Sequence, residues 1–392
     1  MEFHPYFIIY SGQQLPSYEE FYNNVMKKNI ACLFRSQSLT EQWISRKEWI
    51  ANNTDDINFD HLVNKYGTLT VPVYNCNEKH FNSNTKTEML FNEYVDYWKN
   101  VIKNDEQTLN TSNILYLKDW HLAQDSNYDD FYELPVFFES DYLNEYCQDE
   151  QITDFKFTYI GPKGSYTPLH IDVFGSFSWS ANIIGTKRWL MIPEPYIETL
   201  KQLIGEILPH NLYSLPNYME IIEKVHGFEI IQKSGEILFV PSGYLHQVEN
   251  IEHTISVNHN WFNACNLDRI YSNLMNALND VQNEINDLKD DLMDEWNEMC
   301  DKILTIHFGM NRAYFLNIIR HIVTKRLLRR QSNELEFRYK NDIECLSKIY
   351  GKILLNENFI TKNNDDWKNC ELLKNLLEKL TTSQKKSKES TL

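Results

Sequence analysis

The sequence predicts an α+β fold in which a β-rich core is preceded and followed by helices. Short β-rich runs separated by Gly, Pro, Asn and Asp fill the middle of the chain, whereas helical spacing prevails on both sides of it. The 392 residues are 42% hydrophobic and 14% aromatic, which is enough for a large buried core and argues against disorder. Many short strands with turn signals favour a sandwich or barrel, including the double-sheet jelly roll.

The first part of the chain, residues 1–112, is expected to be mainly helical. Residues 17–20 and 85–88 both fit the capping box, in which a hydroxyl residue and a glutamate satisfy the first N–H groups of a helix. Aromatic and apolar residues at helical spacing follow each of them. Between them, residues 69–74 predict a short strand, at a sheet edge because Pro72 has no N–H to donate.

The β-rich core is expected at residues 113–265. A helical insertion at about residues 196–225 interrupts its short runs. The expected strands are the runs ILYL, LPVFF, FKFTYI, YTPLHID, SFSWSANII, KRWLMI, FEIIQ, EILFVP and HTISVNHNW.

Residues 266–380 are expected to be helical again, and the polar residues 381–392 to form a disordered tail. The three expected helical stretches are 267–288, 310–328 and 367–380. A basic run at residues 325–330 could indicate nucleic-acid binding or nuclear import. Because apolar Leu327 and Leu328 interrupt it, a solvated helix face is the better interpretation.

Charge and cysteine usage exclude several classes of function. The net charge of −17 creates no field that would attract nucleic acid or an anionic membrane, although it suits a basic substrate segment. Seven dispersed cysteines without CxxC spacing indicate reduced thiols, not a disulfide framework or a clustered zinc site. No signal peptide is expected, and no apolar run approaches the ~20 residues that cross a bilayer. We therefore expect a cytoplasmic protein.

His170 and Asp172 form a His-x-Asp pair in an expected strand directly after a Gly-Pro-Lys-Gly turn. Residues two apart on a strand share a face, so both side chains can converge on one point. Alone the pair is weak, because roughly one His-x-Asp is expected by chance in such a chain. His246, after a strand that enters a Pro/Gly turn, is a candidate third ligand. Two histidines and one carboxylate leave one face of the ion open, as in non-heme iron(II) oxygenases.

An oxygenase of this kind that uses 2-oxoglutarate needs a cation for the far carboxylate of that cofactor. A carboxylate inside an apolar barrel must be paired and hydrogen-bonded, because its desolvation otherwise costs several kcal/mol. Lys187, at the start of an otherwise apolar strand, is a candidate for this cation. Thr167, three residues before His170, can add a hydroxyl.

Two stretches resemble the core of JmjC hydroxylases: GPKGSYTPLHIDVFGSFSWSANIIGTKRWLMIPEP at 161–195 and GEILFVPSGYLHQVENIEHTISVNHNW at 235–261. Three further motifs are similar to the members of that family that hydroxylate a lysine of the translation release factor. They are YLKDWH, LPVFFESDYLNEY and NHNWFNACN. The resemblance implies a double-stranded β-helix (cupin) core and C4 hydroxylation of a lysyl residue in the release factor. It also implies iron(II), 2-oxoglutarate and O2 as cofactors, with ascorbate as reductant.

The resemblance assigns roles to individual residues. The implied metal ligands, which form the catalytic centre, are His170, Asp172 and His246. The residues implied to bind 2-oxoglutarate are Tyr116, Thr167, Lys187, Asn258 and Asn260. Tyr116 has no spacing signature of its own, and a half-buried aromatic is its alternative interpretation. More distant JmjC hydroxylases carry Asn at the position of Ser180 and Thr at that of Asn258, which leaves the secondary cofactor contacts open.

Two other functions stay open, namely an N-methyl-lysine demethylase with the same iron chemistry and a non-catalytic JmjC scaffold. The chain has no zinc-finger cysteine clusters of chromatin-reading demethylases, and its metal triad is complete, unlike that of a typical scaffold. By analogy, the C-terminal helices could form a homodimer. His121, His253 and His259 lie near the motifs, and we expect them to be structural or surface residues.

Overall fold

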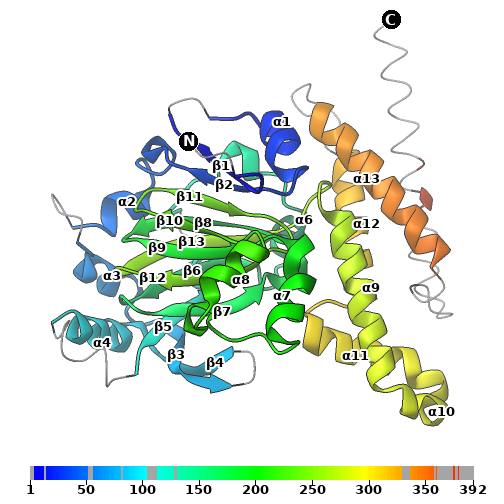
Figure 1. Ribbon diagram of the computed structural model, residues 1–392. Helices are drawn as coiled ribbons and strands as arrows, with labels where there is room; N and C mark the ends of the chain where they lie inside the picture. Colours follow the sequence, from blue (N-terminus) through cyan, green and yellow to red (C-terminus); the bar gives the residue numbers. More distant parts are fainter. Residues whose placement is uncertain are drawn as a thin grey trace, which may run out of the picture.

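The computed structural model describes residues 4–12, 15–51, 56–80, 83–103, 113–127, 130–328 and 336–356, together with residues 359, 374, 375 and 378. At its centre two β-sheets pack face to face, and helices surround them (Figure 1). The predicted α+β class, with a jelly-roll core and helices on both sides of it along the chain, is confirmed.

Within the described residues, the larger sheet has nine strands, and we call it the major sheet. Only β1 and β2 pair in parallel, whereas all other neighbours are antiparallel. In order across the sheet, the strands are β1 (Phe7–Tyr10), β2 (Ala31–Phe34), β11 (Ile237–Val240), β8 (Phe177–Ile184), β13 (Thr254–Trp261), β6 (Lys156–Gly161), β5 (Leu115–Trp120), β3 (Thr70–His80) and β4 (Ser83–Leu90).

The smaller sheet, called the minor sheet, is antiparallel and covers one end of the major sheet. Across the part of the chain that the structure describes, its strands are β10 (Phe228–Gln232), β9 (Lys187–Ile192), β12 (Leu245–Asn250) and β7 (Tyr166–Ile171). A buried cluster joins the sheets, with Leu33 and Leu238 from the major sheet and Trp189 and Ile230 from the minor sheet. The two inner faces therefore enclose a core of their own.

The alternation along β13 explains how a polar site arises inside this sandwich. All eight residues of β13 are buried. Ile255 and Val257 belong to the apolar core on the outer face of the major sheet, whereas Asn258 and Asn260 line a cavity between the sheets. Because side chains alternate between the faces of a strand, one run of sequence supplies both the core and the site.

Residues 1–112 contribute four strands to the major sheet as well as helices. The pattern does not predict β1 and β2, which are short. The predicted capping box at residues 17–20 is confirmed, because Ser17 and Glu20 satisfy each other's backbone N–H groups at the start of α1 (Tyr18–Phe21). The box predicted at residues 85–88 is wrong. These residues lie in β4 and pair with β3, and α4 (Phe91–Lys103) begins only after them.

The strand predicted at residues 69–74 is confirmed as part of β3, but its predicted place at the edge is wrong. β3 lies between β4 and β5, and β4 forms the edge. Pro72 is tolerated because the pairing with β5 starts only at Val73.

Helices from this region cover the outer face of the major sheet (Figure 1). They are α2 (Ile44–Glu48), α3 (Phe59–Tyr66) and α4. Large aromatic side chains fill the interface, and Trp49, Tyr66 and Trp98 are fully buried in it. Such side chains each bury a large apolar area and contribute strongly to a core.

Short helices connect the strands of the core. The predicted helical insertion is confirmed as α7 (Ile197–Ile204) and α8 (Tyr218–Lys224), which pack on the minor sheet. The strand predicted for LPVFF is wrong, because Val136–Phe138 forms a 3₁₀ helix that buries Phe137 and Phe138 in the outer core. The helices α5 (Leu122–Asp125) and α6 (Tyr142–Asp149) flank this turn.

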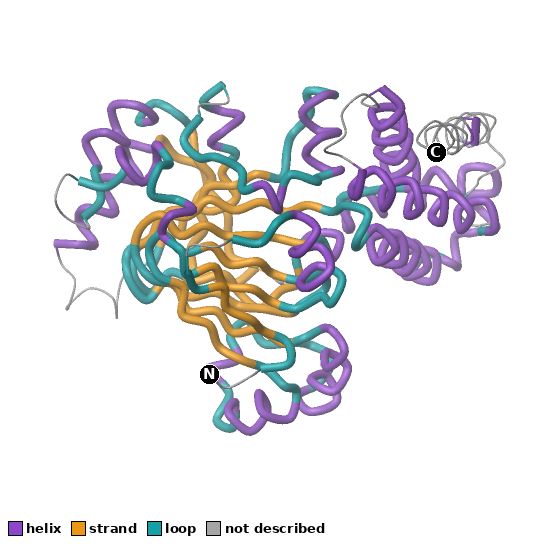
Figure 2. The backbone as a smooth tube through the Cα atoms, turned by 90° about the horizontal axis from the view of Figure 1, so that it is seen from above, coloured by secondary structure: helices purple, strands orange, loops and turns teal. Residues whose placement is uncertain are grey.

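The C-terminal helices form a bundle beside the two sheets, which Figure 2 shows from above. Its described helices are α9 (Leu267–Glu284), α10 (Lys289–Leu292), α11 (Trp296–Phe308), α12 (Arg312–Leu328) and α13 (Glu336–Leu355). The predictions at residues 267–288 and 310–328 are confirmed as α9 and α12. The stretch 367–380 lies almost entirely outside the described residues, and the tail 381–392 lies wholly outside them.

The basic run at residues 325–330 is not simply a solvated face. Arg326 is buried and forms ion pairs with Glu145 and Asp342, and Lys325 pairs with Asp149. The cysteines that the structure describes are free thiols. Among the described helices, none combines the length and the apolar character needed to cross a membrane.

Candidate active site

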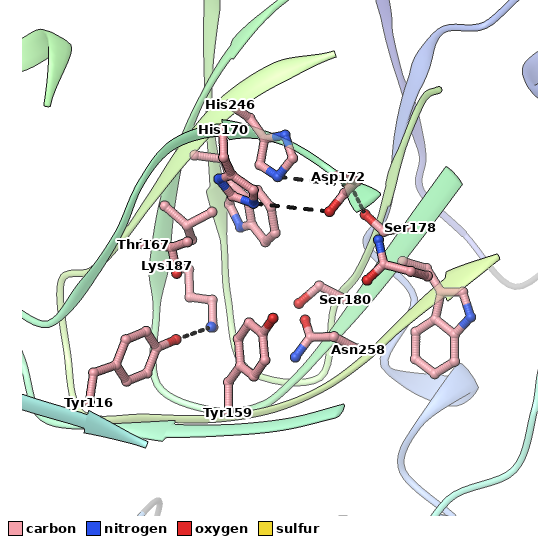
Figure 3. Close-up of a pocket in the computed structure, with 14 residues that line it drawn as sticks. Tyr116, Tyr159, Thr167, His170, Asp172, Ser178, Ser180, Lys187, His246 and Asn258 are labelled. Carbon is pink, nitrogen blue, oxygen red and sulfur yellow. Dashed lines mark hydrogen bonds and ion pairs between the residues drawn. The ribbon is translucent and has the colours of Figure 1, made fainter. Parts of the chain in front are cut away.

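A cavity of about 420 Å³, partly open to solvent, lies between the two sheets. Strands β5, β6, β8 and β13 line it from the major sheet, and β7, β9 and β12 line it from the minor sheet. Figure 3 shows that their polar side chains point toward one another across this space. The cavity is therefore where side chains from distant parts of the chain can act together.

His170, Asp172 and His246 meet at one end of the cavity (Figure 3). One ligand atom from each lies within 4.8 Å of the others. The Nε2 atoms of His170 and His246 each lie 4.0 Å from an oxygen of Asp172. His170 is the last residue but one of β7, and β12 places His246 directly opposite it. The antiparallel register thus brings together two histidines that are 76 positions apart in the sequence.

Both imidazoles are oriented for coordination through Nε2. Nδ1 of His170 lies 2.8 Å from the carbonyl oxygen of Pro168, and Nδ1 of His246 lies 3.1 Å from that of Tyr244. A carbonyl only accepts, so each Nδ1 carries the hydrogen and each Nε2 keeps its lone pair. Burial and the neighbouring His246 lower the pKa of His170 to about 4. At neutral pH the His170 ring is therefore uncharged, as a metal ligand must be.

Ser178 fixes the carboxylate of the triad. Its hydroxyl donates a hydrogen bond of 2.6 Å to Oδ2 of Asp172. Asp172 follows β7, and Ser178 lies in β8, so the bond joins the minor sheet to the major sheet. Such a bond restricts the rotation of a ligand carboxylate and tunes its basicity. The sequence pattern does not single out Ser178, because a serine on a strand has no signature.

The triad fits an iron(II) ion. Two neutral imidazoles and one carboxylate are the donor set of non-heme iron oxygenases, and they leave coordination positions free for cofactor and oxygen. The side chain of His170 is 36% exposed and that of His246 only 3%, so the open side of the triad lies toward His170. A closed structural zinc site would need a fourth protein ligand. Among the described residues, no further His, Cys, Asp or Glu joins this cluster.

Lys187 lies deeper in the cavity and lacks an anionic partner among the described residues. It is 1% exposed, and its ammonium nitrogen lies 3.3 Å from the Tyr116 hydroxyl oxygen. Burial lowers the pKa of Lys187 to about 7. A buried ammonium without a carboxylate is unfavourable, so the site gains free energy when an anion arrives. Its position below the triad fits the far carboxylate of 2-oxoglutarate.

The other residues predicted to contact the cofactor also lie in this cavity. Tyr116, Thr167, Asn258 and Asn260 all line it, with Tyr116 and Thr167 on the side of Lys187. The Asn258 amide donates 3.1 Å to the Ser256 hydroxyl oxygen. These placements agree with the predicted roles, and the roles themselves stay predictions.

Two further residues of the cavity bear on the cofactor site. The Ser180 hydroxyl is buried without a hydrogen-bond partner and faces Asn258 (Figure 3). Tyr159, which the sequence pattern does not indicate, also lines the cavity, and the Lys187 ammonium lies 5.8 Å from the centre of its ring. An unpartnered buried hydroxyl is costly, which makes Ser180 available to a bound ligand.

The three other histidines near the motifs lie outside the triad. The His259 ring lies against Trp179 in a tilted arrangement, with the ring centres 4.2 Å apart, and its Nε2 shares a hydrogen bond of 2.6 Å with the Tyr132 hydroxyl, so it is a core residue. Nδ1 of His253 accepts from the Trp98 indole, and His121 pairs with Asp154. Their expected structural character agrees with these contacts.

Comparison with known proteins agrees with the geometry of the site. The family model described as "JmjC domain, hydroxylase" matches residues 157–261, which run from β6 to β13. The chain is 39% identical to the 2-oxoglutarate and iron-dependent oxygenase JMJD4 of Danio rerio over 82% of this chain and 76% of that protein. It is 36% identical to the JMJD4 homolog of Drosophila melanogaster over 89% of this chain and 90% of that protein. It is also 34% identical to the arginine-specific demethylase JMJ20 of Arabidopsis thaliana over 90% of this chain and 77% of that protein.

Proposed function

The chain belongs to the JMJD4 family of 2-oxoglutarate and iron-dependent oxygenases, and we propose that it hydroxylates a lysyl residue of the translation release factor at C4. Dependence on iron and 2-oxoglutarate comes with the family, whereas the lysine and the release factor are our proposal. The His170–Asp172–His246 triad, open on one side above Lys187, supports the oxygenase chemistry. The observation that carries the proposed substrate is the set of three motifs that resemble release-factor hydroxylases.

The roles of the individual residues follow from their places in the cavity. His170, Asp172 and His246 would hold the iron, and Ser178 would fix the orientation of Asp172. Lys187 and Tyr116 would hold the far carboxylate of 2-oxoglutarate, together with Thr167. When bound, iron and 2-oxoglutarate activate O2, so that one oxygen atom enters succinate with release of carbon dioxide and the other enters a C–H bond of the substrate. The chain itself contributes orientation and the exclusion of water.

The motifs that resemble release-factor hydroxylases gather around this cavity. YLKDWH covers all but the first residue of β5, which carries Tyr116 into the cavity, and the first three residues of NHNWFNACN include Asn258 and Asn260 of β13. LPVFFESDYLNEY ends in α6, where the Asn144 amide donates 2.9 Å to the Asn260 carbonyl oxygen. Motifs that are far apart in the sequence thus meet at one site, which supports a shared substrate.

The decisive test is the mass of the release factor after incubation with the protein, iron(II), 2-oxoglutarate, ascorbate and oxygen. We expect a gain of one oxygen atom on a single lysine, and its loss in Asp172→Ala. Fragmentation and comparison with synthetic hydroxylysines would locate the oxygen at C4. Succinate formed without modification of the release factor would overturn the substrate, and absence of both would favour the scaffold function instead.

Demethylation is the second candidate, because the chain covers 77% of a relative named an arginine-specific demethylase. The same iron chemistry would hydroxylate an N-methyl group, which then leaves as formaldehyde. The two reactions differ in the mass of the product, because hydroxylation adds oxygen and demethylation removes a methyl group. Methylated lysyl and arginyl peptides in parallel assays would therefore distinguish them.

A further inference from the structure

Gly161, the last residue of β6, lies directly against the aromatic ring of Tyr116. A Cβ atom built on Gly161 would lie 2.5 Å from Cδ2 and 2.8 Å from Cε2 of that ring. Carbon atoms that are not bonded to each other pack at about 3.5–4.0 Å. The φ of Gly161 is not positive, so its backbone would accept other residues. Glycine is therefore required here by the space that the Tyr116 ring occupies.

The Tyr116 ring has little freedom to move aside. Tyr116 is 1% exposed, and the Tyr159 ring contacts it edge to face, with the ring centres 6.1 Å apart. The other neighbour of the missing Cβ is the Ser165 hydroxyl, which donates 2.6 Å to the Pro162 carbonyl oxygen and accepts 2.8 Å from the Asn250 amide. A side chain at the end of β6 must therefore displace the ring, break these hydrogen bonds or do both.

The place of the ring determines where its hydroxyl group lies. The Lys187 ammonium donates 3.3 Å to the Tyr116 hydroxyl oxygen, and Figure 3 shows both groups at the end of the cavity away from the triad. Burial raises the pKa of Tyr116 above its usual range, so the hydroxyl keeps its proton and can donate it to a carboxylate. Because the hydroxyl lies farther from the backbone than Cδ2 and Cε2, a tilt that frees these carbons moves the hydroxyl even further. Hydrogen bonds weaken steeply when their angle departs far from linear, so such a tilt disturbs this end of the cavity.

We propose that Gly161 is a positioning residue of the cofactor site. Its missing side chain lets the Tyr116 ring lie against β6, where the hydroxyl and Lys187 together receive the far carboxylate of 2-oxoglutarate. The inference rests on the proposed role of Tyr116 and does not depend on which protein is the substrate. Gly161 acts through the ring and leaves the triad unaffected. This gives a function to the first glycine of the Gly-Pro-Lys-Gly turn.

The test measures the Kd of 2-oxoglutarate on protein loaded with manganese(II), which occupies the triad without turnover. In Gly161→Ala this Kd should rise about 10- to 100-fold, because the Tyr116 hydroxyl no longer reaches the carboxylate. The Kd of manganese(II) itself should stay the same, since the triad lies at the other end of the cavity. Tyr116→Ala should also raise the Kd of 2-oxoglutarate about 10- to 100-fold, and adding Gly161→Ala to it should change this Kd by less than about twofold.

Two controls separate positioning from a general loss of structure. Ser165→Ala removes the other group that a Cβ would meet, so in this background Gly161→Ala should weaken 2-oxoglutarate binding as much as in the unaltered protein. If Gly161→Ala alone does not fold, this double variant is compared with Ser165→Ala in its place. Gly227→Ala is a matched crowded glycine, because its Cβ would lie 2.9 Å from Cγ2 of Ile222 on the outer side of the minor sheet. It should lower the unfolding temperature and leave the Kd of 2-oxoglutarate unchanged.

An unchanged Kd of 2-oxoglutarate in Gly161→Ala would overturn the inference. So would an equal loss of affinity with and without the Tyr116 side chain, or a recovery of affinity in the Ser165→Ala background, because neither effect would act through the ring. If Tyr116→Ala binds 2-oxoglutarate as tightly as the unaltered protein, the role of Tyr116 fails and the inference fails with it. The expected Kd values in a protein that hydroxylates no lysine of the release factor would support the inference and refute the proposed substrate alone.

Discussion

At the scale of single residues, Lys187 is a basic side chain in an almost fully buried place, which rarely occurs. It is almost fully buried, and its ammonium nitrogen lies 3.3 Å from the Tyr116 hydroxyl oxygen. Burial lowers its pKa to about 7, well below the usual value of 10.5. In the free protein Lys187 therefore loses its proton near neutral pH, whereas a bound carboxylate would keep Lys187 protonated.

This difference predicts that 2-oxoglutarate binds more weakly as the pH rises above about 7. Below that pH Lys187 is already protonated, and it adds no pH dependence to binding. Above it, binding must take up one proton, so the Kd should rise up to about tenfold per pH unit. Calorimetry of manganese-loaded protein in buffers of different ionisation enthalpy would measure both the Kd and the proton uptake.

Lys187→Arg is the control for this prediction. Arginine stays charged throughout this pH range, so its Kd should be flat between pH 7 and 9 even if the longer side chain weakens binding. A Kd of the unaltered protein that does not change over the same range would mean that Lys187 is charged in the free cavity. If the Kd of the arginine variant also rose with pH, the pH dependence would have an origin other than Lys187.

The residues of the site differ in how far they could be predicted from the sequence. His170 and Asp172 share a strand face, and a turn marks the strand of His246, so spacing and context indicate the triad. Tyr116 came only from resemblance to a family. Ser178 could not be found at all, because its bond to Asp172 joins two strands of different sheets and leaves no local pattern.

At the scale of secondary structure elements, the turn between β8 and β9 positions Lys187. Gly185 has a φ of +78°, and a Cβ built there would lie 2.0 Å from the backbone oxygen of His253. The Asn182 amide donates 2.6 Å to the Gly185 carbonyl oxygen and fixes the turn. Neither the backbone angle nor the space allows a side chain at this position.

We therefore predict that Gly185→Ala lowers the free energy of unfolding by about 2–4 kcal/mol and weakens 2-oxoglutarate binding, because β9 must shift. Gly351→Ala is a control of opposite sign. Gly351 lies within α13, and nothing lies within 4 Å of a Cβ built on it. Alanine should stabilise that helix by about 0.5–1 kcal/mol. Urea unfolding of both variants measures the two values, and equal effects would contradict the explanation.

Elements with a long, regular pattern were predictable, and elements fixed by distant contacts were not. The amphipathic helix α9 and the polar–apolar alternation of β13 follow from the sequence. β1 and β2 do not, since four-residue strands gain their stability from neighbours such as β11. Residues 85–88 fit a capping box and a strand equally well locally, and pairing with β3 decides between them.

At the scale of the whole molecule, buried charges join the C-terminal bundle to the sandwich. The Arg326 guanidinium on α12 donates 2.5 Å to Asp342 on α13 and 3.1 Å to Glu145 on α6. The Tyr142 hydroxyl donates to the other oxygen of Asp342 at 2.6 Å. Buried ion pairs with such hydrogen bonds specify one arrangement more than they add stability. The bundle is therefore held in a defined position beside the site, available to act as an interface.

We propose that this bundle mediates a homodimer, because large apolar side chains are exposed on its helices. Ile306 on α11 is 77% exposed and Leu355 at the end of α13 is 87% exposed. Deleting the chain after Asn333 would be a poor test of this dimer interface. It would remove α13, whose Leu346 and Ile349 are fully buried, so the fold itself would suffer.

Point substitutions avoid this difficulty and give the last prediction. In Ile306→Glu and Leu355→Glu, light scattering should show the mass of one chain where the unaltered protein shows the mass of two, because a charge in an apolar interface is costly. Ile207→Glu, 90% exposed just after α7 and outside the bundle, is the matched control and should leave the dimer intact. A monomeric unaltered protein at micromolar concentration, or dissociation by the control alone, would refute the proposed interface.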